Sequence, residues 1–165
     1  SFIISACSRI YKRDFLINNN LFFYEGILHE DNDFTPKALF YATRVSYKNY
    51  VFYYRTHNES SITKNNKNIR RFEGLLISAN EIYKLYIKNK KDKYLRKIYS
   101  SIFSSAHVYV TNNFSKNEYK KILEGNIIYH EIKKEILIST KLKIFLRKIL
   151  PKKIIEFVRR RNEFI

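Results

Sequence analysis

The sequence predicts an α+β first half, residues 1–66, followed by a mainly α-helical extension. Only 3 Gly and 2 Pro occur in 165 residues, which is too few for the many tight turns of a β-sandwich or β-barrel. Apolar residues make up 45% of the chain and aromatic residues 16%, which excludes an intrinsically disordered protein. Strand-like and helix-like segments alternate in the first half, whereas in the extension the apolar residues recur with a helical period.

The first half is expected to begin with short elements. Residues 8–18 form an amphipathic segment that ends at three consecutive asparagines, and residues 21–24 form a short aromatic strand. Asp33 is expected to cap a helix that runs to Thr43, because the apolar residues of this segment recur at helical spacing. Pro36 is compatible with that helix because it falls in the first turn.

Residues 45–54 are rich in β-branched and aromatic side chains, a composition typical of strands. We therefore predict a strand or one arm of a hairpin there, followed by a loop over residues 55–66. Together with the strand at residues 21–24, this segment supports the α+β class.

The helical extension covers residues 67–138 and begins with one long amphipathic helix. Its apolar stripe runs over residues 69–87. A second helix is expected near residues 94–110. Ser115 and Glu118 form a capping box, which predicts a third helix up to the end of the extension.

The formal net charge of the chain is +17, and it is distributed unevenly. Residues 1–63 carry 7 basic and 6 acidic side chains, whereas residues 64–165 carry 25 and 9, so the two parts have net charges of +1 and +16. A charge of this size indicates polyanionic partners such as nucleic acid or acidic lipid. The abundance of Lys, Asn and Ile also fits an AT-rich genome, which would raise the Lys content without a functional cause.

Residues 139–165 form a basic tail, with 9 basic and 2 acidic side chains interleaved with large apolar residues. This pattern predicts one or two amphipathic helices, divided at Leu150 and Pro151, that lie in a membrane interface. The expected partner is an anionic membrane surface, to which each Lys or Arg contributes roughly 1 kcal/mol. The alternative is that the apolar face covers the preceding helices and the charges are solvated.

Two further features concern the chain as a whole. The absence of Met favours the interpretation that the sequence is the back part of a longer polypeptide. A single cysteine, Cys7, excludes an internal disulfide framework. No apolar run approaches the roughly 20 residues of a transmembrane helix, so we expect a soluble or peripheral protein.

The densest acidic cluster of the first half lies at residues 29–33, with the sequence His-Glu-Asp-Asn-Asp. Carboxylates at the start of a helix have two chemical uses: one can accept a proton from an attacking hydroxyl, and a pair can hold a divalent metal. A structural explanation is also open, in which Asp31 or Asp33 only caps the helix.

Four motifs occur in a fixed order within residues 1–63: the basic segment CSRIYKRDFL, the Glu-Asp pair of GILHEDNDF with a helix after it, the segment VFYYR, and the closing Ser-Ile-Thr. In this order they resemble the second half of a family 2 glycosyltransferase with the GT-A fold. The resemblance implies that residues 1–66 are the C-terminal, acceptor-side part of a GT-A α/β catalytic domain. It also implies that the nucleotide-binding half, with its Asp-x-Asp metal motif, is absent from this chain, which we therefore expect to be inactive alone.

The resemblance also implies roles for individual residues. Asp31 would be the general base that deprotonates the acceptor hydroxyl, and Glu30 would orient Asp31 or contact the acceptor. Arg55, His57 and Ser61 would lie in the loop that approaches the donor diphosphate, with His57 a candidate ligand of the divalent cation, Mg²⁺ or Mn²⁺. The alternatives are a surface cation for Arg55 and a solvated loop histidine for His57.

Arg9 and Tyr11 lie in the basic segment, which in this family lies near the acceptor. The resemblance therefore implies that both residues bind substrate. Cys7 stands where many members of the family have Trp, so we do not expect a side chain that stacks on the acceptor at this position.

The predicted function is an inverting glycosyltransferase that transfers a sugar from a nucleotide-sugar donor to a cell-surface glycan or a lipid-linked acceptor, as in bacterial polysaccharide or capsule synthesis. The expected location is cytoplasmic and peripheral, on the inner face of the plasma membrane. The alternatives are a basic helical nucleic-acid-binding module and a structural helical adaptor. Nucleic acid is the less favoured partner, because the aromatic residues of the basic half fall within apolar stripes.

Overall fold

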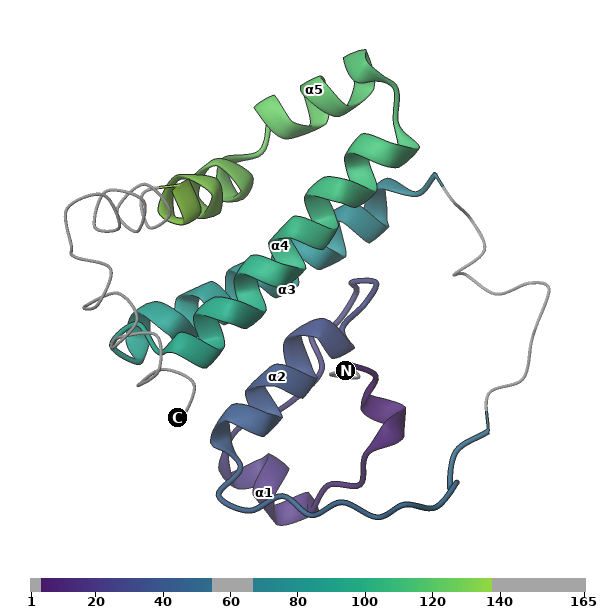
Figure 1. The fold of residues 1–165 in the computed structure, drawn as a ribbon, viewed down its shortest axis with the longest axis vertical. Helices are drawn as coiled ribbons and strands as arrows, with labels where there is room; N and C mark the ends of the chain where they lie inside the picture. Colours follow the sequence, from purple (N-terminus) through teal and green to yellow (C-terminus); the bar gives the residue numbers. More distant parts are fainter. Residues whose placement is uncertain (1–3, 55–66, 138–165) are drawn as a thin grey trace, which may run out of the picture.

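The computed structural model describes residues 4–54 and 67–137 of the chain. Figure 1 shows two long helices that run side by side, with shorter elements on either side of them. In chain order the elements are η1 (Ala6–Ser8), α1 (Arg13–Asn18), α2 (Asp31–Tyr41), α3 (Ile69–Lys88), α4 (Lys93–Asn113) and α5 (Lys116–Glu124), and residues 127–137 are also helical.

The predicted α+β class is wrong, because residues 4–54 and 67–137 contain helices and no strand. Residues 21–24 and 45–54 lack the ladder of hydrogen bonds that defines a strand. Their composition favours a strand, but a strand forms only where a second extended segment pairs with it. No such segment lies beside them in the described part, and side chains such as Tyr47 and Val51 are exposed instead. These residues are therefore not the C-terminal part of a GT-A α/β sheet.

The two long helices, α3 and α4, confirm the predictions made from the apolar stripes. Asn68 caps α3 by accepting a hydrogen bond from the backbone of Arg70 at 3.0 Å, and Asp92 caps α4 by accepting one from Leu95 at 3.0 Å. The connection between the helices is short, and Lys90 and Lys91 adopt left-handed backbone angles in it. A connection of this length makes the helices antiparallel neighbours.

The third predicted helix is divided in two. It begins where the capping box predicts, since the backbone N–H and the hydroxyl of Ser115 both donate to Glu118. However, α5 ends at Glu124, and Asn126 caps a new helix by accepting a hydrogen bond from Tyr129 at 3.0 Å. Gly125 is a weak helix former and Asn favours caps, which explains the break.

The main hydrophobic core lies between α3, α4 and the helix at residues 127–137. Its fully buried members include Phe72, Ile82, Leu95, Tyr99 and Ile132. A second, smaller core packs α2 against residues 6–21; it consists of Leu21, Phe34 and Ala38 with Ala6, Tyr11, Phe15 and Leu16 around them. Helix α2 also contacts α3, so the acidic cluster lies between the two cores.

Candidate functional site

The Glu30–Asp31 pair lies where α2 begins. Asp31 is the first residue of the helix, and Glu30 is its N-cap residue. The side chain of Glu30 accepts no capping hydrogen bond from the backbone of the first turn. The helix therefore begins two residues before the predicted cap, Asp33, which instead lies inside the first turn and is buried. Two carboxylates in the first turn interact favourably with the positive end of the helix dipole.

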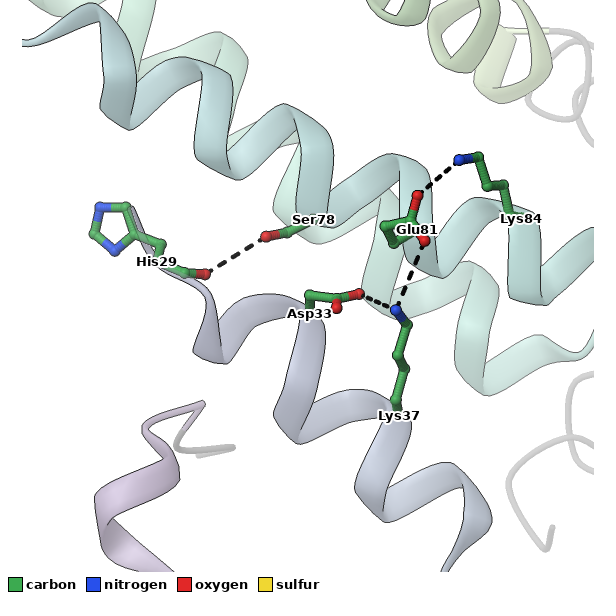
Figure 2. Close-up of polar contacts among 6 residues, drawn as sticks. All are labelled: His29, Asp33, Lys37, Ser78, Glu81 and Lys84. Atoms are coloured by element: carbon green, nitrogen blue, oxygen red, sulfur yellow. Dashed lines mark hydrogen bonds and ion pairs between the residues drawn. The ribbon is translucent and has the colours of Figure 1, made fainter. Parts of the chain in front are cut away.

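The turn that leads into α2 has an unusual backbone. Gly26 and His29 have φ angles of +79° and +66°, and the second value is uncommon for a residue other than glycine. The carbonyl oxygen of His29 accepts hydrogen bonds from the backbone N–H of Asn32 at 2.9 Å and from its side chain at 3.2 Å. A third donor comes from α3: the hydroxyl of Ser78 lies 3.5 Å from the same oxygen (Figure 2).

Burial raises the pKa of Asp31 above its ordinary value of 3.8, and the neighbouring charge of Glu30 raises it further. Burial lowers the pKa of His29, and the nearby positive charge of Arg71 adds to this effect. His29 is therefore biased toward its neutral form. A carboxylate with a raised pKa is a stronger base, and a partly exposed one remains accessible to a hydroxyl group.

A chain of charged side chains joins α2 to α3 (Figure 2). The amine of Lys37 lies 2.6 Å from a carboxylate oxygen of Asp33 and 3.8 Å from one of Glu81, and Glu81 also pairs with Lys84 at 2.7 Å. The Asp33 side chain is only 2% exposed, so its charge has little contact with water. Burial raises the pKa of Asp33, whereas Lys37 lowers it. Lys37 is thus the residue that joins α2 to α3, and Asp33 pairs with it inside α2.

Replacing Lys37 with glutamine is expected to reduce the free energy of unfolding at pH 7 by about 1–3 kcal/mol, because it leaves the buried carboxylate of Asp33 without a partner. The folded-state pKa of Asp33 is raised, so the cost of ionising it is present above that pKa and disappears as the pH falls through it. The loss of unfolding free energy caused by Lys37→Gln should therefore be smaller in acid than at pH 7. Urea titrations of the wild type and the variant at both pH values measure this difference.

Lys84→Gln is the matched control, because Lys84 pairs with the same Glu81 but its side chain is 63% exposed. Its effect should stay below about 1 kcal/mol. If the Lys37 variant lost equal stability at both pH values, the charge of Asp33 would not be the cause.

The structure brings one of the two predicted acceptor residues to α2. The ring of Tyr11 packs edge-on against Phe34, with the ring centres 5.3 Å apart. Arg9 donates instead to the backbone of Ser5 at 2.8 Å, and its charge acts on Tyr94 of α4. The three loop residues predicted to approach the donor lie outside the described residues; they are Arg55, His57 and Ser61.

Within residues 4–54 and 67–137, no three side chains of His, Cys, Asp or Glu lie close enough together to hold a metal ion. The predicted metal ligand, His57, is not among the described residues.

The sequence interpretation missed two residues of α3 that touch the acidic turn. These are Ser78 and Gly74, and Gly74 is buried against the backbone of Leu28. A signal existed, because an isolated glycine inside a long helical stripe often marks a close packing contact. This signal does not identify the segment that approaches the helix.

Comparison of the sequence with models of protein families, with curated proteins and with solved structures finds no match. Among the helices of the described part, none combines the length and the apolar character that crossing a bilayer requires.

Proposed function

We propose that this chain carries the catalytic carboxylate of an inverting glycosyltransferase similar to family 2. The observation that supports the proposal is the Glu30–Asp31 pair: Asp31 begins a helix, lies partly buried, and has a pKa raised by burial and by Glu30. The motifs before and after this pair, in the order described for the sequence, are the second support. The donor is a nucleotide sugar, and the acceptor is a cell-surface glycan or a lipid-linked glycan.

In the proposed reaction, Asp31 accepts the proton of the acceptor hydroxyl. The acceptor oxygen forms a bond to the anomeric carbon while the bond from that carbon to the diphosphate breaks, so the nucleoside diphosphate leaves with the electron pair. Attack from the face opposite the leaving group inverts the anomeric configuration. Glu30 keeps the pKa of Asp31 raised through its charge, and Tyr11 lies against the first turns of the same helix.

The proposal includes a location at the inner face of the plasma membrane. Its support is the composition of residues 139–165, whose net charge of +7 follows from 9 basic and 2 acidic side chains. Basic residues attract anionic lipid headgroups. An acceptor linked to lipid would be presented at the same surface.

The test is nucleotide release by the full-length natural protein. UDP-, GDP- and CMP-activated sugars are each incubated with a bacterial membrane lipid extract as the acceptor, with Mg²⁺ or Mn²⁺ present. The expected result is acceptor-dependent release from one donor, with a product of inverted anomeric configuration by ¹H NMR. No release from any donor, together with tight DNA binding that weakens steeply with salt, would favour the nucleic-acid-binding alternative.

A further inference from the structure

We propose that Gly74 and Ser78 of α3 are positioning residues for the sugar-transfer reaction, because they hold the turn before Glu30 and Asp31 in place. This inference rests on the proposed function. It assigns a role in the reaction to the helical extension, for which the sequence predicts helices and no catalytic role.

Gly74 allows the backbone of the turn to lie directly on α3. A Cβ atom at this position would lie 2.0 Å from the carbonyl oxygen of Leu28, and 3.0 and 3.1 Å from its carbonyl carbon and nitrogen. These are backbone atoms, so they cannot rotate away as the end of a side chain can. Glycine weakens a helix interior relative to alanine, and the contact with Leu28 explains why glycine is present here.

Ser78 holds the next carbonyl group of the same turn. It lies one helical turn after Gly74 and is fully buried, and its hydroxyl donates a long hydrogen bond of 3.5 Å to the carbonyl oxygen of His29. His29 itself has the left-handed φ angle of +66°. Such a conformation persists in a residue other than glycine when its surroundings hold it.

The two contacts act together because they fall on one face of α3. Residues four apart on a helix lie above one another, and here they contact two consecutive residues, Leu28 and His29. Glu30 and Asp31 follow immediately. The position of the turn on α3 therefore sets the position of the Asp31 carboxylate, and a displacement of about 1 Å can reduce a catalytic rate by about 100-fold.

The test compares Gly74→Ala and Ser78→Ala in the polypeptide that shows transfer. We expect kcat to fall by up to about 100-fold in the first variant and by about 10-fold in the second, with KM for the donor unchanged. The acidic limb of the pH–rate profile should move to lower pH, because a displaced Asp31 is less buried. The charged groups that act on Asp31 are Glu30 and His29, and neither variant changes them.

Matched controls come from other helices of the chain. At Gly125 an added Cβ would meet only Lys121, at an ordinary 3.4 Å. Ser104 donates to the carbonyl of Ser100 within its own helix. The variants Gly125→Ala and Ser104→Ala should keep the wild-type kcat and pH profile. Ile132→Ala, which removes a core side chain far along the chain from the turn, shows what lower stability alone does.

Because Gly74→Ala can fail to fold, a second measurement uses Ser78→Ala and needs no activity. The carboxyl pKa of Asp31 is measured by ¹³C NMR in the 165-residue chain. We expect a raised value in the wild type and in Ser104→Ala, and a shift toward 3.8 in Ser78→Ala, that is, toward the ordinary value.

The outcomes separate the two proposals. If Asp31→Asn left transfer intact, the proposed function would fail. If Asp31→Asn abolished transfer while the Gly74 and Ser78 variants kept the wild-type kcat and pH profile, only the positioning role would be overturned. Equal losses in the Ile132 variant would also overturn it, because stability alone would then explain the effect.

Discussion

Replacing Asp31 with asparagine is expected to lower kcat for sugar transfer by about 10²–10⁴-fold. The amide keeps the shape of the side chain but cannot accept the acceptor proton at neutral pH. Binding of the donor should be unchanged, since it does not depend on the charge of Asp31 in the proposed reaction. The measurement is the rate of acceptor-dependent nucleotide release per enzyme molecule, in wild type and variant at saturating donor and acceptor concentrations.

The pH dependence of transfer gives a second readout of the same residue. The base must be ionised, so the rate should fall as the pH decreases through the pKa of Asp31, which lies above 3.8. Glu30→Gln removes the neighbouring negative charge that raises this pKa, and should move the acidic limb to lower pH. The residual activity of Asp31→Asn should show no acidic limb in its pH–rate profile.

Asp14→Asn is the matched control for Asp31→Asn. Asp14 also lies in the first turn of a helix, α1, but its side chain is exposed and the proposed reaction assigns no role to it. Its activity should equal that of the wild type. A residual rate in Asp31→Asn within a factor of two of wild type would contradict the role of Asp31 as the base.

Replacing Tyr99 with alanine is expected to reduce the free energy of unfolding by about 3–5 kcal/mol. Tyr99 is fully buried at the centre of the α3–α4 core, and its ring centre lies 5.3 Å from that of Tyr83 and 5.2 Å from that of Tyr86. Removing the ring leaves a cavity that rigid helices cannot fill. Urea unfolding followed by circular dichroism measures the loss.

Tyr99→Phe is the matched variant, because it keeps the ring and removes only the hydroxyl. At pH 7 we expect it to retain most of the stability that Tyr99→Ala loses. Burial raises the pKa of Tyr99 to about 12, from an ordinary value of 10.0. The unfolded chain thus loses this proton before the folded chain does, so Tyr99 makes stability decrease as the pH rises between these two values.

Tyr99→Phe should therefore lose less stability than the wild type between pH 9 and pH 11. The two proteins are compared by thermal unfolding across this range. Identical alkaline profiles would show that Tyr99 does not titrate differently in the folded and unfolded chains. A small effect of Tyr99→Ala at pH 7 would show that the ring is not part of a rigid core.

The long helices could be predicted because their signal is local. The apolar stripe over residues 69–87 and the capping box of Ser115 and Glu118 lie within or beside the helices they predict. The division at Gly125 had a signal of the same kind, but the apolar period alone continues through it. Local periodicity therefore gives the type of an element more securely than its end.

The strands could not be predicted correctly because a strand depends on a second segment. Residues 45–54 have the composition of a strand, yet in the described structure they make no ladder. The start of α2 also differs from the prediction. Asp33 has the chemistry of a cap, but it is buried inside the first turn and pairs with Lys37, one turn further along the same helix.

The acidic cluster could be identified from the sequence, whereas the residues of α3 that contact its turn could not. Glu30 and Asp31 are adjacent, so their pairing could be recognised directly. The partners of the turn are distant: Ser78 lies 49 positions from His29 along the chain. A glycine or serine in a helix has many possible partners, and the sequence alone does not choose between them.

The distance along the chain between the turn and α3 also has a consequence for the order of folding. The contacts between α3 and α4 are local and form quickly, whereas docking the turn on Gly74 first requires closure of a long loop. We therefore expect the helical hairpin to form before Leu28 and His29 reach their places. Glu30 and Asp31 would therefore reach their final positions late in folding. The amide hydrogens of residues 26–31 should exchange with solvent through local unfolding of the turn, while the α3–α4 hairpin stays folded.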